Sequence, residues 1–348
     1  MVRRHIERIK SAAARRARVR LRGMWARVSN ARRPVILMYH RIAHEEFDPW
    51  GLAVAPDKFA EQLAGLAKSR TLISLSEFAS LHRRGDLTDD AVAVTFDDGY
   101  ACTANVAAPL LEQYDVPATI FIPASLIGRG RLFWWDELRQ IVMTHPGTSL
   151  RAGGHTIQLG ETQDADGVWP RDSRKRTPRQ NGFYALWAHL QPLPLDQIQQ
   201  TLAELRAKHS PTTIDDEQLR LMTEDEVRSI RSDKIQFGSH ALTHVSLPSL
   251  THAKKAQEIR DSVAGCERLV GTRPVSFAYP FGDFDPDCEA LVAEAGFACA
   301  CTVEPRAIAA DDDVFALPRI KVGNWTWRQL RQQLADISLD RHQAAIEA

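Results

Sequence analysis

The stretch AVAVTFDDGY, residues 91–100, decides the fold of this chain. Its first six residues are apolar apart from one threonine, a pattern that predicts a strand buried on both faces, as in a parallel sheet. Asp97 and Asp98 follow that strand directly. An unpaired buried carboxylate is energetically costly, so we expect a cation opposite these two aspartates.

Predicted strands alternate with predicted helices along most of the chain, which implies parallel strands joined by right-handed crossovers. Seven or eight such units favour a closed α/β barrel over an open sheet. The carboxyl ends of barrel strands meet at one rim, where active sites form. The expected strands cover residues 34–40, 91–96, 118–123, 234–240, 274–280, 297–303 and 314–322, and the expected helices cover 56–69, 103–114, 252–270, 286–295 and the residues after 326.

One long segment, residues 130–225, interrupts this alternation. It is too long for a loop between a strand and a helix, and it contains helical patterns near 182–191 and 196–208. We therefore predict a mainly helical insertion that covers the rim. It would belong to a barrel domain spanning residues 34–348, preceded by a basic N-terminal arm, residues 1–33.

The basic arm carries twelve Lys or Arg residues and a single acid, Glu7, although the whole chain has no net charge. Arginines stand where a secretory signal needs an apolar stretch, and no segment has the roughly 18 apolar residues of a transmembrane helix. One hypothesis is a cationic helix in peripheral contact with anionic lipid. The alternative is a solvated arm, or one that packs on the acidic body.

The cysteines and the arm also bear on location and partners. Five scattered cysteines without a C-x-x-C pair predict neither a disulfide framework nor a structural zinc site. Together with the missing signal they favour the cytoplasm, or the inner face of the membrane. We expect no nucleic-acid partner, because no groove-binding or base-stacking pattern accompanies the arm.

The sequence GSHALTH, residues 238–244, closes another predicted strand and places His240 and His244 four residues apart. If one helical turn follows the strand, both imidazoles point the same way. Two histidines and a carboxylate form a three-ligand set for a divalent cation, with zinc the first choice, and leave an open coordination position as catalytic sites do. Such a cation would balance the charge of Asp97 and Asp98.

TFDDGY followed by GSHALTH resembles the first two motifs of the polysaccharide deacetylase family, carbohydrate esterase family four, also called the NodB homology domain. ILMYHRI, PATIFIP, SFAYPFG and LPRIKV extend the resemblance over most of residues 34–323, but not over the arm or the middle of the insertion. The resemblance implies a distorted (β/α)7 barrel. It also implies hydrolysis of N- or O-acyl groups, usually acetyl, on sugars with one divalent metal ion.

Carried over by position, the resemblance makes Asp97 the general base and Asp98 a metal ligand beside His240 and His244. It implies zinc, with cobalt or nickel as alternatives. In this chemistry the metal polarises the acyl carbonyl and lowers the pKa of a bound water, whose proton Asp97 accepts.

The sequence AYPFG, residues 278–282, resembles the third family motif, whose aromatic residue offers a backbone N–H to the oxyanion. The resemblance places Phe281 in this role. Tyr279, Pro280 and Gly282 would shape the substrate groove around it.

The later motifs depart from the family pattern. Ala278 stands where the third motif has an arginine that orients the base, the motif D-x-x-D-W is not recognisable, and Arg319 stands where the last motif has a histidine that protonates the leaving amine. A guanidinium does not act as an acid, but Arg319 could pair with Asp97 and replace the missing arginine. His40, at the end of the first predicted strand, is our candidate proton donor. The alternative is a core histidine hydrogen-bonded to the backbone.

The sequence FWWDEL, residues 133–138, opens the insertion. Trp134, Trp135 and Asp136 could line the groove, because aromatic faces stack on sugar rings and a carboxylate can hold hydroxyl groups. The alternative is the start of an amphipathic helix with buried tryptophans. We expect one tryptophan to face the groove and the other to be buried. Asp136 could instead orient Arg319.

These patterns predict a metal-dependent hydrolase acting on carbon–nitrogen bonds other than peptide bonds. It would remove N-acetyl or related acyl groups from a saccharide, expected to be a cytoplasmic or membrane-associated glycan precursor. A metal-dependent amidase on a non-sugar acyl compound and a non-catalytic saccharide-binding protein are the alternatives. The presence of both a base and an open metal position argues against the non-catalytic alternative.

Overall fold

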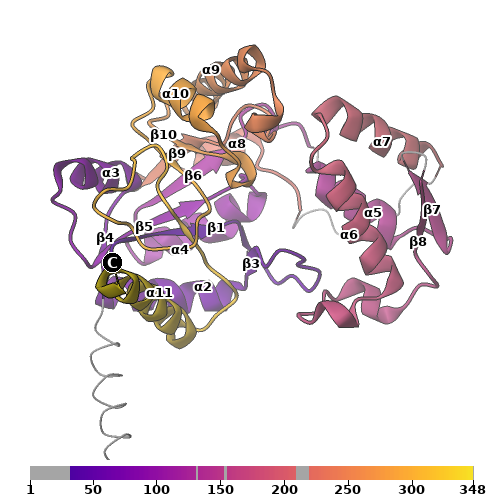
Figure 1. Cartoon of the computed structure of the whole chain (residues 1–348), viewed down its shortest axis with the longest axis horizontal. Coiled ribbons are helices and arrows are strands. Elements are labelled where there is room, and N and C mark those ends of the chain that lie inside the picture. The colour runs from indigo at the N-terminus through magenta and orange to yellow at the C-terminus, as the bar shows by residue number, and fades with distance from the viewer. Residues whose placement is uncertain (1–31, 131, 153–154, 209–218, 348) are drawn as a thin grey trace, which may run out of the picture.

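The computed structural model describes residues 32–130, 132–152, 155–208 and 219–347. Its centre is a barrel of parallel strands with helices on the outside (Figure 1). In their order around the barrel the strands are β11 (Cys299–Cys301), β10 (Ser276–Ala278), β9 (Ile235–Ser239), β6 (Ala118–Ile122), β5 (Ala91–Phe96), β1 (Val35–Tyr39) and β12 (Ile320–Lys321). Three short strands complete this part of the chain: β4 (Thr71–Leu72) pairs with β5, and β2 (Arg41–Ile42) pairs with β3 (Ala53–Val54).

The barrel closes through the segment that leads into β12. Leu317 pairs with Cys301 of β11 in a parallel bridge, and Ile320 pairs with Leu37 of β1. The same short segment therefore contacts both ends of the sheet, as an irregular seventh strand. This confirms the distorted (β/α)7 barrel that the resemblance implies.

The inside of the barrel holds a small apolar core. Ala93 of β5 and Phe121 of β6 belong to one buried cluster with Leu75 and Phe78 of α3 (Leu75–Arg84). The strand that precedes α3, β4, pairs with the first residues of β5. The helix therefore closes the end of the barrel opposite the carboxyl ends of the strands, and that other end is left for function.

Helices cover the outside of the barrel with their apolar faces. In α2 (Pro56–Ser69) the apolar residues recur at helical spacing and are buried, as the sequence predicts. The helix predicted at 103–114 is less regular, because a π-helical turn, Thr103–Ala107, precedes α4 (Ala108–Gln113). The other outer helices are α8 (Glu224–Ser229), α9 (His252–Val270), α10 (Pro286–Glu294) and α11 (Trp327–Glu347).

Most of the chain between β6 and β9 forms a lobe beside the barrel (Figure 1). A two-stranded hairpin accompanies the helices expected there. The elements of this lobe are α5 (Trp134–Met143), β7 (Ser149–Ala152), β8 (His155–Gln158), α6 (Pro178–Leu190) and α7 (Leu195–Lys208).

The loop between β2 and β3 joins the lobe to the barrel. Glu45 in this loop accepts hydrogen bonds from Arg139 of α5 at 3.0 and 3.2 Å. Phe47 packs edge to face against Phe183 of α6, with ring centroids 5.4 Å apart. Because β2 follows the carboxyl end of β1, these contacts hold the lobe beside the rim of the barrel.

No helix in the described part of the chain is long and apolar enough to cross a membrane. Nearly all of the basic arm, residues 1–31, lies outside that part. The lipid contact expected of the arm therefore stays a prediction, as does its boundary with the barrel domain.

Candidate metal centre and active site

The candidate site lies at the rim, where the carboxyl ends of β5, β9 and β10 come together. Asp97 and Asp98 follow β5, His240 follows β9 and Tyr279 follows β10. These side chains line one cavity of about 590 Å³, which also receives side chains from the lobe. The barrel thus gathers into one cavity motif residues that are far apart in the sequence.

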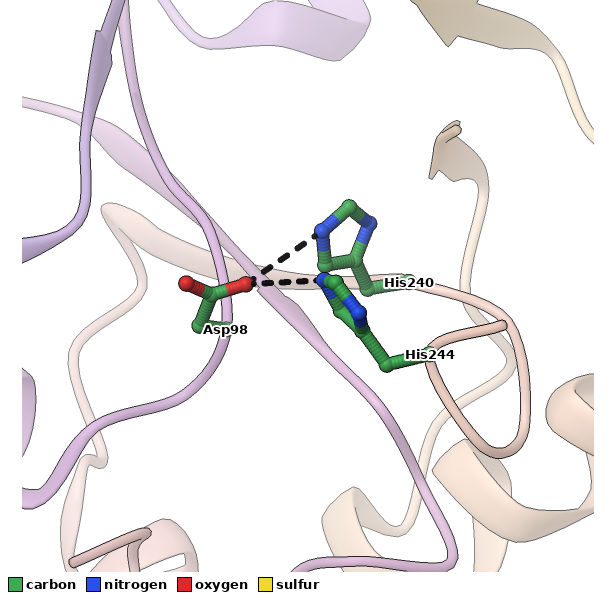
Figure 2. A group of neighbouring side chains, drawn as sticks. All are labelled: Asp98, His240 and His244. Atoms are coloured by element: carbon green, nitrogen blue, oxygen red, sulfur yellow. Dashed lines mark ion pairs between the residues drawn. The ribbon is translucent and has the colours of Figure 1, made fainter. Parts of the chain in front are cut away.

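Asp98, His240 and His244 face one another across this cavity (Figure 2). Asp98 Oδ1 lies 3.1 Å from His244 Nε2 and 3.5 Å from His240 Nε2, and all three residues are buried. One donor atom from each residue lies within 4.8 Å of the other two. Burial alone would raise the pKa of Asp98, but the two histidines hold it well below its usual value, so the carboxylate is ionised.

The loop after β9 positions both histidines without the helical turn that their spacing suggests. Ala241 and His244 have positive φ angles of 60° and 56°, and Asp98 has a φ of 75°. This left-handed region is unfavourable for residues that carry a side chain, so the ligand loops are strained. The expected local geometry is therefore wrong, although the imidazoles of His240 and His244 do meet, with ring centroids 4.7 Å apart.

The hydrogen bonding of His240 fits a bound cation. Its Nδ1 lies 2.8 Å from the Ala278 carbonyl oxygen, and because a carbonyl only accepts, this nitrogen carries the hydrogen. Nε2 of the same ring therefore faces Asp98 Oδ1, and either a proton on Nε2 or a metal ion can lie between these two atoms. Two imidazole nitrogens with a carboxylate oxygen suit zinc or a similar divalent metal.

Asp97 is held by Arg319 in a buried two-point ion pair. Guanidinium atoms Nη1 and Nη2 each lie 2.7 Å from one Asp97 oxygen. Arg319 also donates to Thr302 O and Thr95 Oγ1, at 2.9 and 3.2 Å. Burial alone would raise the pKa of Asp97, but Arg319 outweighs it and lowers that pKa below the ordinary value. Asp97 is therefore ionised at neutral pH, and the structure shows the predicted pairing of Arg319 with Asp97.

His40 also lines the cavity beside Asp97. Its Nε2 lies 4.0 Å from Asp97 Oδ2. Its Nδ1 is buried and has no hydrogen-bond partner among the described residues, so the structure does not place it as a backbone-bonded core histidine. Burial lowers the pKa of His40 more than Asp98 and Asp97 raise it, which leaves the resting imidazole neutral at pH 7.

Aromatic rings surround His244. Trp135 and Phe281 pack against the imidazole with ring centroids 5.1 and 4.7 Å away, and both line the cavity. Phe281 has a positive φ of 60° in a turn whose internal hydrogen bonds are donated by Gly282 and Asp283. The Phe281 N–H takes no part in those two bonds, as the predicted oxyanion role requires.

The other residues predicted to form the groove are divided between the cavity and the layer behind it. Tyr279 lines the cavity, whereas Pro280 and Gly282 belong to the adjoining turn and not to its lining. Trp134 is also outside the lining and stacks on Trp187 of α6, with ring centroids 6.5 Å apart. One tryptophan of FWWDEL thus faces the cavity while the other packs within the lobe.

Asp136 lies behind the cavity wall, in neither of its two predicted positions. It does not line the cavity, and Arg319 pairs with another aspartate. Asp136 Oδ2 accepts a hydrogen bond from Tyr100 Oη at 2.8 Å, and Tyr100 Oη accepts one from Trp135 Nε1 at 3.2 Å. Burial raises the pKa of Asp136 to about 6, against the effect of Arg41. This chain of hydrogen bonds fixes the indole of the cavity wall.

Among the cavity residues that were not singled out from the sequence are Trp50, Trp187, Gln191 and Lys321. Trp50 lies in the β2–β3 loop, where its carbonyl oxygen accepts a hydrogen bond from Lys321 Nζ at 2.6 Å. Helical spacing places Trp187 beside Phe183 and Leu190, so no sequence signal pointed to its place in the cavity.

The fold and the site together define a parallel α/β barrel with a candidate metal site at the carboxyl ends of its strands. The sequence matches the polysaccharide deacetylase family over residues 84–162 and 196–300, which is more than half of the chain. The chain belongs to this family. The predicted enzyme class, a hydrolase of carbon–nitrogen bonds other than peptide bonds, is that of the family.

Individual relatives are distant. The chain is 25% identical over 101 residues to the putative polysaccharide deacetylase YxkH of Bacillus subtilis; the match covers 29% of this chain and spans about a third, 36%, of the length of that relative. The Streptococcus pyogenes deacetylase PplD, solved in complex with acetate, has a TM-score of 0.56 at 17% identity, covering 86% of this chain and 97% of that one. IcaB from Ammonifex degensii has a TM-score of 0.55 at 18% identity, covering 87% and 97%. At these identities the two structures show a shared fold.

Removing one partner of the Asp97–Arg319 pair should cost more stability than the whole pair contributes, because the other charge stays buried and unpaired. Arg319→Met leaves a buried carboxylate unpaired and Asp97→Asn leaves a buried guanidinium unpaired, so each should lower the free energy of unfolding by about 3–5 kcal/mol. The double variant should lose clearly less than the sum, with a coupling of roughly 1–3 kcal/mol in urea denaturation at pH 7. Additive losses would contradict a direct pair.

The coupling between Asp97 and Arg319 should weaken as pH falls. The pKa of Asp97 is lowered on folding, so its carboxylate stabilises the folded state. This stabilisation is fully present above the ordinary aspartate pKa of 3.8 and is lost as pH falls below that value. The same urea series repeated at falling pH checks this.

Proposed function

We propose that the protein is a metal-dependent N-deacetylase that releases acetate from an N-acetylated saccharide. The observation that carries the proposal is the cluster of Asp98, His240 and His244 directly beside the ionised Asp97 in one cavity. A metal site next to a positioned base suits hydrolysis. The aromatic rings of the cavity favour a sugar, whose C–H faces pack on such rings, over a small acyl amide.

A divalent cation held by Asp98, His240 and His244 would polarise the acyl carbonyl and make a water molecule more acidic. Asp97 accepts the proton of the attacking water, because it is charged and fixed in position. With its low pKa, Asp97 holds that proton weakly. His40, with Nε2 4.0 Å from Asp97 Oδ2, takes it up and donates it to the leaving amine as the carbon–nitrogen bond breaks.

The acyl oxygen gains negative charge during the attack and needs a hydrogen-bond donor. The N–H of Phe281 serves this role in the proposal, since it stands outside the internal bonds of its turn. Trp135, fixed through Tyr100 and Asp136, limits the position of the acyl group beside His244.

We further propose that the substrate is a glycan precursor in the cytoplasm or at the inner face of a membrane, with residues 1–33 in contact with anionic lipid. The twelve basic side chains of this arm support the contact. The full chain should cosediment with vesicles that contain phosphatidylserine, and less so as salt is raised. No cosedimentation at low salt would overturn the lipid contact.

The purified chain should carry about one divalent ion per molecule. Asp98→Ala and His240→Ala each remove a ligand, so bound zinc should fall nearly to zero in elemental mass spectrometry, and acetate release should fall with it. His252→Ala is the matched control, because this histidine is exposed on α9 and pairs with Asp287. Full metal content in both ligand variants would sink the proposed site.

Asp97→Asn and His40→Ala should keep the metal and lose turnover, by about 10²–10⁴-fold in kcat. The loss follows because each substitution removes a proton-transfer group while Asp98, His240 and His244 stay in place. Acetate release is measured at a temperature where thermal unfolding shows each variant to be folded. Near wild-type turnover in His40→Ala would rule out the proton donor, and near wild-type turnover in Asp97→Asn would rule out the base.

A further inference from the structure

We propose that the lobe carries a second saccharide subsite, built on Trp187, for the sugar next to the one that loses its acyl group. This inference rests on the proposed function, because it takes the sugar that loses its acyl group to lie at the metal centre. The subsite would bind the neighbouring sugar of the same chain.

A row of aromatic rings runs from the metal centre into the lobe. Trp135 packs on His244 at 5.1 Å between ring centroids, and Trp134 packs edge to face on Trp135 at 5.5 Å. Trp187 stacks on Trp134 at 6.5 Å, with the two planes inclined by 15°. The indoles of Trp134 and Trp135 therefore separate Trp187 from His244.

Trp187 lies at the edge of the core face of α6, where it is packed against the core but not fully buried. The core face consists of buried residues such as Phe183, Leu186 and Leu190. Trp187 is partly exposed and lines the cavity, as does Gln191. Residues four apart on a helix share a face, so the Gln191 amide lies beside the indole.

Trp50 completes the subsite from the barrel side. Its ring centroid lies 5.3 Å from that of Trp187, with the planes inclined by 47°, so the two indoles form a corner. Lys321 also lines this cavity and donates to the Trp50 carbonyl oxygen. Trp50 belongs to the β2–β3 loop and Trp187 to α6, so the subsite lies where the loop and the lobe meet.

The chemistry of these groups matches a neutral sugar ring. A pyranose presents C–H groups on its faces and hydroxyl groups around its edge. The indoles of Trp187 and Trp50 suit the faces, and the Gln191 amide and Lys321 ammonium suit the hydroxyl groups. The cavity of about 590 Å³ is also within the range of sites that enclose a whole ligand.

The test compares kcat/KM for acetate release from N-acetylglucosamine and from its β-1,4-linked tetrasaccharide. One stacked sugar is worth about a factor of ten, so the wild type should favour the tetrasaccharide by about tenfold. Trp187→Ala should bring this ratio close to one, and Trp187→Phe, which keeps an aromatic face, should retain most of it.

Trp169→Ala is the matched control. Trp169 is another partly exposed indole of the lobe, but it packs on Phe47 at 5.1 Å and lies outside the cavity lining. Its loss should leave the ratio of the two kcat/KM values unchanged. No preference for the tetrasaccharide in the wild type, or an unchanged ratio in Trp187→Ala, would overturn the subsite while leaving the proposed function in place.

If the wild type releases no acetate from either saccharide, calorimetric measurement of saccharide binding to Asp97→Asn separates the two proposals. If the wild type releases no acetate, but Asp97→Asn binds the tetrasaccharide about tenfold more tightly than the monosaccharide and Trp187→Ala removes this difference, the subsite stands and the proposed function falls. If neither saccharide binds, the subsite falls as well.

Discussion

The buried ion pair between Asp97 and Arg319 is the interaction on which the rest of this site depends. It joins the carboxyl end of β5 to the segment that closes the barrel, and through Thr302 it also reaches the end of β11. A bare carboxylate at this depth would be costly. The guanidinium keeps it ionised and in one orientation. The contact that seals the barrel therefore also prepares the base for proton transfer.

The fold followed from local patterns in the sequence, and the meeting of the motif residues followed from the fold. The buried strand at 91–96 and the alternation of elements were sufficient, because strand ends in a parallel barrel must converge. The pairing of His240 and His244 with Asp98 was predicted, but for a wrong local reason. Their loop depends on left-handed backbone at Ala241, and no residue preference in the sequence indicates such strain.

Side-chain contacts across the tertiary structure were harder to predict. Arg319 was considered as the partner of Asp97 because the arginine of the third family motif is missing at Ala278, and the structure shows the contact. Asp136 sits in a layer behind Trp135 that exists only once the lobe packs on the barrel. Trp187 was likewise hidden, because a helical pattern places it beside the core residues of α6 but does not show what else that edge of the helix contacts.

The strained loops have a consequence for how this protein can change. Asp98, Ala241, His244 and Phe281 all adopt left-handed backbone, and all lie in the loops that build the cavity. Each such position costs about 1–3 kcal/mol, which the barrel beneath must offset. Selection for heat resistance alone would therefore act first on these positions, because relaxing them adds stability at once. Stability and activity therefore compete most directly at this rim.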